Sequence, residues 1–202
     1  MQKKGLLFTI FCFVFLYVPV FYSCMSSGHF APAGEDSVLM QNEAIEAFSA
    51  AKKYESNKQY AAAISCYEKA MQYDTLRDTS YYRMGRCYAL MGEWKKAEDV
   101  FASILAKDAA NSSIKDSLGY VYVQSGKYEQ AESVYESLSA EHPFNAEYSY
   151  KYIKALFQNG KKSEALAAFT AFKNTFPRNS EEIKTLTRLL TEQPDNSDIS
   201  AD

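Results

Sequence analysis

Alanine recurs at intervals of 34 residues through most of this 202-residue chain. The four alanines are Ala63, Ala97, Ala131 and Ala165, and no insertion disturbs the register between them. An aromatic residue follows each of them four positions later, as Tyr67, Phe101, Tyr135 and Phe169. A period of this length is typical of arrays in which each unit is one supersecondary element. The chain is therefore expected to fold as a stack of similar units.

Each unit contains two apolar stripes with helical spacing, separated by a residue that ends the first stripe. Glycine stands at that place in the last three units, as Gly92, Gly126 and Gly160. Two such stripes around a helix-ending residue predict a helix, a turn and a second helix. Small residues in both helices, such as Gly85 and Ala97, would let the two backbones approach closely. The aromatic side chain would then fill the wedge that opens toward the next unit.

These columns resemble the tetratricopeptide repeat, and the resemblance covers residues 44–179. It implies an all-α fold, a right-handed α-α superhelix of four helix-turn-helix repeats. The repeats would occupy residues 44–77, 78–111, 112–145 and 146–179. Three or more hairpins have to stack before their apolar faces are buried. The fourth repeat is the least typical, because Ile153 stands where the family has a small residue.

The end of the chain resembles the closing element of such an array. Ile183, Leu186 and Leu190 continue the helical spacing beyond the fourth repeat. This spacing predicts a capping helix over residues 180–192, with the polar outer face that terminal repeats need. Residues 193–202 are polar and acidic, and we expect a disordered tail there.

The beginning of the chain has the pattern of an export signal. Two lysines precede an almost wholly apolar run over residues 6–22, and this order is typical of a secretory signal peptide. The dipeptide Ser23-Cys24 that follows resembles the lipobox of bacterial lipoproteins, although Phe21 and Tyr22 depart from that pattern. The resemblance implies a signal peptide over residues 1–23 and lipidation of Cys24.

Two alternatives to this interpretation stay open. The apolar run could be retained as a membrane anchor, or cleavage could follow Ala33 and leave Cys24 unmodified. Residues 24–43 are rich in Ser, Gly, Ala and Pro in their first part and are interpreted as a flexible spacer.

Charge and motifs limit the function classes. The net charge is −3, so the sequence lacks the basic character of a nucleic-acid-binding domain. His29 and His142 have no cysteine or carboxylate at metal-ligand spacing, and no phosphate loop or GxSxG motif is present. The sequence therefore predicts no catalytic residue, no metal site and no cofactor.

Cys66 and Cys87 are interpreted as small apolar side chains, and a disulfide between them stays open.

The family resemblance also implies which side chains would meet a partner. In tetratricopeptide arrays the first helix of each hairpin lines a concave groove. The matching columns here supply these groove residues: Phe48, Lys52, Tyr82, Arg86, Tyr120, Tyr150, Lys154 and Phe157. Aromatic and cationic side chains dominate the binding energy of many interfaces. The family's carboxylate clamp for chaperone tails is not matched, since Lys52 and Arg83 stand where it requires asparagine.

Together these observations favour a lipid-anchored scaffold or adaptor in a bacterial cell envelope. It would face the periplasm and hold another envelope protein in its groove. One alternative is binding of an apolar or anionic small molecule for an envelope transporter. Another is a structural homo-oligomer that assembles through the ends of the array. The sequence does not identify the partner, the oligomeric state or the membrane that carries the anchor.

Overall fold

The structure is a computed structural model that describes residues 35–192. Within this range the chain forms nine α-helices and no strand. The helices are α1 (Glu35–Ser56), α2 (Tyr60–Ala70), α3 (Asp74–Leu90), α4 (Trp94–Leu105), α5 (Ser112–Gln124), α6 (Tyr128–Glu141), α7 (Ala146–Gln158), α8 (Lys162–Thr175) and α9 (Ser180–Glu192). The chain divides into two compact units between Met40 and Gln41, and all packing described below lies within the second unit.

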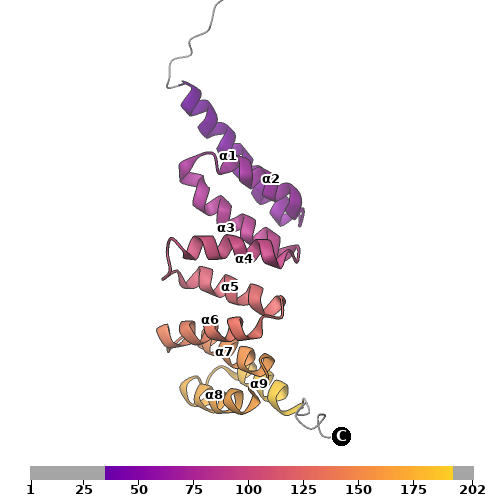
Figure 1. Cartoon of the computed structure of the whole chain (residues 1–202), viewed down its shortest axis with the longest axis vertical. Coiled ribbons are helices and arrows are strands. Elements are labelled where there is room, and N and C mark those ends of the chain that lie inside the picture. The colour runs from indigo at the N-terminus through magenta and orange to yellow at the C-terminus, as the bar shows by residue number, and fades with distance from the viewer. Residues whose placement is uncertain (1–34, 193–202) are drawn as a thin grey trace, which may run out of the picture. The chain divides into compact units, whose positions relative to one another are not determined.

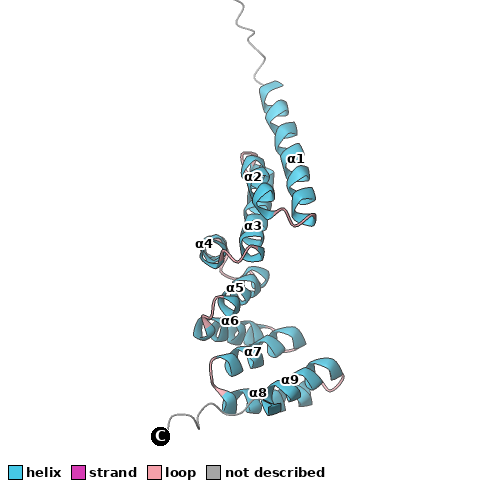
Figure 2. Ribbon diagram, turned by 90° about the vertical axis from the view of Figure 1, so that its right-hand side faces the viewer, coloured by secondary structure: helices cyan, strands magenta, loops and turns pink. Residues whose placement is uncertain are grey.

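Consecutive helices pack against one another in chain order, from α2 on α3 to α7 on α8, and α9 packs on α8 and α7. Figures 1 and 2 show this succession of helices joined by short turns. The helices pair into four hairpins, α1 with α2, α3 with α4, α5 with α6 and α7 with α8, and α9 closes the array. The predicted all-α array of helix-turn-helix repeats with a closing helix is therefore confirmed for the described residues.

The small residues that recur in the sequence lie at tightly packed contacts between helices. Ala63, Ala97, Ala131 and Ala165 are fully buried. A Cβ atom built on Gly85 would lie 2.8 Å from the Phe101 ring, and one on Gly119 would lie 2.7 Å from the Tyr135 ring. The aromatic side chain thus lies against the first helix of its own hairpin. Phe101 also belongs to the apolar cluster that includes Ile114 and Leu118 of α5, so it packs toward the next hairpin as well.

The turn inside each hairpin requires a left-handed backbone at one residue. Gly92, Gly126 and Gly160 have φ angles of 76°, 75° and 79°. Glycine adopts this conformation without steric cost because it has no Cβ atom. The first hairpin has Lys58 at the corresponding place, with φ of 60°, so the turn geometry is kept without the glycine.

Two predicted boundaries differ from the structure. Helix α1 begins at Glu35, so the interpretation of residues 24–43 as a flexible spacer is wrong for residues 35–43. This stretch contains neither proline nor glycine and continues directly into the first repeat, where Ala44 is buried. Helix α3 begins at Asp74, ahead of the expected repeat boundary at residue 78. Thr75 stands where later repeats have Pro143 and Pro177, so no proline limits this helix start.

The remaining predictions for the chain ends lie outside the described residues. They are the signal peptide over residues 1–23, lipidation of Cys24 and the tail over residues 193–202. The closing helix is described, and its Leu186 and Leu190 are buried in a cluster with Phe169 and Phe172.

Candidate functional site

The first helices of the second, third and fourth hairpins line a hollow of about 250 Å³, which we call the groove hollow. Its walls are mainly apolar. The lining residues are Arg86, Ala89 and Leu90 from α3, Phe101 from α4, Asp116, Ser117 and Tyr120 from α5, and Lys151 from α7. Arg86 and Tyr120 were predicted as groove residues from the sequence, and the structure brings them together here.

The other predicted groove residues do not line this hollow. Phe48 and Tyr82 are half-buried, and their ring centroids lie 5.7 Å from Tyr67 and 6.0 Å from Phe101. These two aromatic side chains therefore belong partly to the cores of their hairpins. Lys52 is exposed on α1.

In the fourth hairpin the three predicted groove residues are also half-buried. Tyr150 and Phe157 pack against the apolar cluster of that hairpin. The Lys154 ammonium lies 5.5 Å from the centroid of the Tyr150 ring, within the range of a cation–π contact. None of these three side chains lines the groove hollow.

A carboxylate of the first hairpin lies close to two arginines of α3. The side chain of Glu55 is only 12% exposed and accepts hydrogen bonds from the Tyr67 hydroxyl at 2.6 Å and from Arg83 Nη1 at 3.0 Å. Arg86 Nη1 lies 3.8 Å from the other oxygen of the same carboxylate. Burial, together with the Glu55 carboxylate, raises the pKa of the Tyr67 hydroxyl, which therefore stays protonated at neutral pH.

A second ion-pair network joins α5 to α7 at the groove hollow. Lys151 Nζ donates to both oxygens of Asp116, at 2.7 and 2.8 Å, and lies 2.7 Å from Glu147. Burial alone would lower the pKa of the Lys151 ammonium, but the hydrogen bonds to these two carboxylates outweigh it and raise the pKa. Lys151 is therefore charged at neutral pH and its donors are engaged. This pair was not predicted from the sequence.

A repeated ion pair joins neighbouring hairpins at another part of the array. Lys127 Nζ lies 2.6 Å from Glu98, and Lys161 Nζ lies 2.6 Å from Glu132. Both pairs span 29 residues, so the same contact recurs one repeat later. Asn159 also donates to Glu132 at 2.6 Å. This recurrence could have been found by comparing charge columns between adjacent repeats.

Glu132 makes the stability of the array depend on pH. Burial acts to raise the pKa of this carboxyl, but hydrogen bonds from Lys161 and Asn159 overcome that effect and lower it. A carboxyl whose pKa is lower in the folded state stabilises the fold above its unfolded pKa of about 4.3, and that contribution disappears as the pH falls.

We expect the Glu132→Gln variant to lose about 1–2 kcal/mol of unfolding free energy at pH 7, because the charge-assisted bonds are removed. The loss should become smaller as the pH falls below about 4.3. Urea denaturation followed by circular dichroism at neutral and acidic pH measures both values. Glu136→Gln is the matched control, since Glu136 is an exposed glutamate of the same helix. An equal loss for Glu132→Gln at every pH would contradict the ion-pair explanation.

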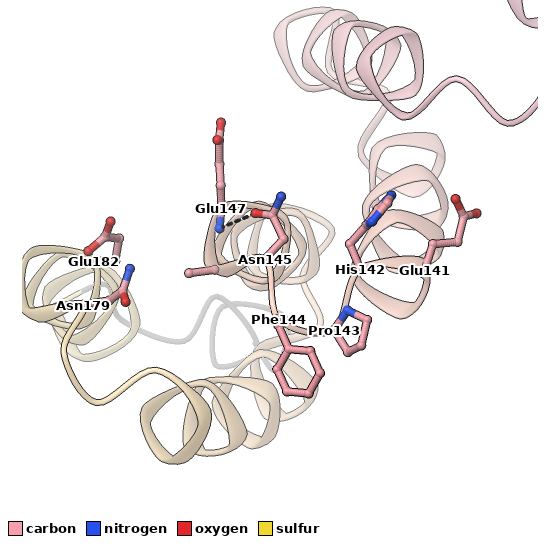
Figure 3. A pocket seen from close by; sticks show the side chains of 9 residues that line it. Glu141, His142, Pro143, Phe144, Asn145, Glu147, Asn179 and Glu182 are labelled. Atoms are coloured by element: carbon pink, nitrogen blue, oxygen red, sulfur yellow. Dashed lines mark hydrogen bonds between the residues drawn. The ribbon is translucent and has the colours of Figure 1, made fainter.

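A larger and more open hollow, of about 660 Å³, lies beside the turns that begin α7 and α9. Figure 3 shows its lining, with the side chains of Phe144 and Asn145 pointing to opposite sides of the turn. Asn145 accepts a hydrogen bond from the Glu147 backbone N–H at 3.0 Å and so caps α7. Glu141 is paired with Lys115 at 2.7 Å, and His142 Nε2 lies 2.8 Å from the Ser112 hydroxyl. These groups fasten the turn, so the groove hollow is the better candidate for binding.

The described residues offer little for other kinds of site. No group of three or more His, Cys, Asp or Glu side chains between residues 35 and 192 is arranged to hold a metal ion. Within the same range, none of the helices combines the length and the apolar character that crossing a membrane would require. Cys66 and Cys87 are free thiols in the structure. Burial raises the pKa of the Cys87 thiol to about 11, which makes this thiol unreactive at neutral pH.

Known proteins share this architecture. Family models described as tetratricopeptide repeat match residues 54–118 and residues 117–180. A solved structure of MamA from Desulfovibrio magneticus RS-1, residues 41 to the end, matches with a TM-score of 0.62 and 17% identity over 76% of this chain and 94% of that chain. YrrB, described as a TPR protein with an unusual peptide-binding site, matches with a TM-score of 0.57 and 22% identity over 79% of this chain and 88% of that chain.

At these identities the likeness to solved structures concerns the fold. No curated protein matches the sequence. The fold is that of a scaffold for protein interactions, and the two family matches together span most of the four hairpins. The chain therefore belongs to the tetratricopeptide repeat family.

Proposed function

We propose that this protein is an adaptor that binds an extended segment of another protein at the groove hollow. The observation that carries the proposal is the hollow itself, which opens between α3, α5 and α7 on the predicted groove face. Two large apolar side chains at the hollow are exposed to solvent: Tyr120 is 47% exposed and Leu90 is 50% exposed. Exposed tyrosine next to an apolar recess is typical of the anchor points of protein interfaces.

The size of the hollow favours a side chain over a whole small molecule. Small-molecule sites usually enclose about 300–1,000 Å³ and bury most of their ligand. The groove hollow holds about 250 Å³ and is partly open. One large apolar side chain of a partner fits this space, while the rest of the segment lies along the groove. This is why we prefer a protein partner to the alternative of a bound apolar or anionic solute.

The test compares Tyr120→Ala with a matched tyrosine outside the hollow. Crosslinking in cells followed by mass spectrometry identifies partners of the unmodified chain. For a partner bound at the hollow, recovery with Tyr120→Ala should fall about tenfold, as expected when an interface anchor is truncated. Tyr128→Ala is the control, because Tyr128 is 36% exposed at the start of α6 and does not line the hollow. Equal recovery with both variants would remove the groove hollow from the function.

We also propose that the adaptor is a lipoprotein of a bacterial envelope, anchored through Cys24 and facing the periplasm. Its support is the order of lysines, apolar run and Ser23-Cys24 in the sequence. A single acyl chain gives only weak membrane binding, so stable anchoring needs more than one. The Cys24→Ser variant should lose both incorporation of labelled palmitate and sedimentation with membranes. Unchanged labelling of that variant would exclude Cys24 as the lipidated residue.

A further inference from the structure

Arg86 is a cation with unused hydrogen-bonding capacity at the groove hollow. Its guanidinium makes no hydrogen bond to any other described residue, and its nearest carboxylate oxygen, on Glu55, lies 3.8 Å away. The side chain is 45% exposed and lines the hollow. The other lining cation, Lys151, already donates to Asp116 and Glu147. Arg86 is therefore the lining cation that can take up an incoming anion.

The charge balance near Arg86 also favours an anion. The Glu55 carboxylate is satisfied by Tyr67 and Arg83, so two guanidinium groups share one carboxylate on this side of the groove. On the other side, two carboxylates surround Lys151. An incoming carboxylate is thus attracted to the wall that holds Arg86 and repelled from the wall that holds Asp116. This asymmetry gives the bound segment a preferred placement.

A guanidinium group matches a carboxylate with two parallel hydrogen bonds, which gives both strength and directional selectivity. The apolar side chains of Ala89, Leu90 and Phe101 lie in the same hollow as Arg86. In an extended segment each residue advances by about 3.3 Å. A carboxylate within two residues of a side chain in the hollow can therefore reach the guanidinium.

We infer that the groove selects acidic peptide segments in which Asp or Glu lies within two residues of a large apolar side chain. The apolar side chain enters the hollow, and the carboxylate pairs with Arg86. This inference rests on the proposed function and adds the chemical class of the partner. It also makes Arg86 the residue that determines specificity, whereas Tyr120 contributes apolar contact area.

Selection from a random phage-displayed peptide library tests the inference. The full-length chain in detergent is the bait, and the variants are Tyr120→Ala, Arg86→Gln, Arg86→Glu and Lys52→Gln. We expect the unmodified chain to enrich sequences with Asp or Glu next to Leu, Phe or Tyr. Arg86→Gln should lose the acidic preference, and Arg86→Glu should exchange it for Lys or Arg. Lys52→Gln, at the corresponding place of the first hairpin, should keep it.

A selected peptide then allows a double-substitution cycle by fluorescence anisotropy. Replacing its acidic residue by the amide should weaken binding to the unmodified chain about tenfold, the effect of one charge-assisted hydrogen-bonded pair. The same peptide change should have no effect on binding to Arg86→Gln.

The outcomes separate the two proposals. Enrichment that depends on Tyr120 but shows no acidic preference, or a preference that Arg86→Gln retains, would overturn the inference and leave the proposed function intact. Loss of the preference in Lys52→Gln as well would also overturn it, since general charge would then explain the selection. Enrichment that is equal for the unmodified chain and Tyr120→Ala would overturn the proposed function itself.

Discussion

Replacing Phe101 by alanine should lower the free energy of unfolding by about 3–5 kcal/mol, the range measured for truncation of buried aromatic side chains. The Phe101 ring is 1% exposed and lies against Gly85 within the second hairpin. It also belongs to the cluster that includes Ile114, Leu118 and Val121 of the third hairpin. Truncation therefore leaves a cavity both within one hairpin and at the junction to the next.

The loss should also change the shape of the unfolding transition. The stability of a repeat array is approximately the sum of the stabilities of its units and of the interfaces between neighbours. Because Phe101 contributes to both, its truncation should uncouple the first two hairpins from the last two and broaden the transition. Urea denaturation followed by circular dichroism measures the midpoint and the width together.

Leu166→Ala is the control for Phe101→Ala, since Leu166 is exposed on the second helix of the fourth hairpin. A substitution at such a surface position usually changes stability by less than about 0.5 kcal/mol. If both variants lost the same small amount, the aromatic column would not be the element that joins the hairpins.

Much of the fold could be predicted because the physics of one hairpin recurs in each repeat. A small residue in each helix allows close approach, and this requirement appears in the sequence as fixed columns such as Gly85 with Ala97. The left-handed turn appears in the same way as Gly92, Gly126 and Gly160. A position in one repeat can therefore be interpreted with the help of the equivalent positions in the other three repeats. This compensates for weak signals in a single repeat.

The candidate site was only partly predictable from the sequence. The repeat pattern shows which side of a helix faces the groove, but it does not show which residues at the edge of that side are exposed. Arg86 and Tyr120 lie clearly on the open side of the groove. Phe48 and Tyr82 occupy equivalent positions in the first two hairpins. Their rings pack on Tyr67 and Phe101 and do not line the hollow. The sequence records the column but not the rotation of the helix that decides this outcome.

The ion pairs were not predicted, because they depend on the conformations of long side chains and on the spacing between helices. Asp116 and Lys151 are 35 residues apart, one residue more than the repeat period, so a comparison of equivalent columns does not join them. Such pairs nevertheless decide which cation remains able to bind an anion. Lys151 and Arg86 are both positively charged, but only the structure shows that the donors of Lys151 are already engaged.

A methyl group added at Gly119 should cost about 1–3 kcal/mol of stability, the usual effect of overpacking a core. The opposing effect is smaller, because alanine in place of glycine stabilises a helix interior by about 0.5–1 kcal/mol. The new Cβ atom would lie 2.7 Å from Tyr135 Cζ and within 3.1 Å of two further ring atoms. The ring has little room to move, since Tyr135 is 3% exposed and packed among Ala131, Leu138 and Ala155.

A second substitution tests whether the Tyr135 ring causes this cost. Tyr135→Leu removes the ring atoms that the new methyl group would meet, so Gly119→Ala should be less costly in that background. Urea denaturation of the two single variants and the double variant gives the coupling energy, which is usually about 0.5–3 kcal/mol for residues in contact. Equal costs of Gly119→Ala in both backgrounds would show that the ring is not responsible.

Ala51 has a Cβ atom at the corresponding place of the first hairpin and is fully buried in a cluster with Tyr67, so the fold itself accepts a methyl group there. The cost at Gly119 is therefore set by the local distance between α5 and α6. If that cost disappears in the Tyr135→Leu background, the small and aromatic columns together determine the spacing of each hairpin.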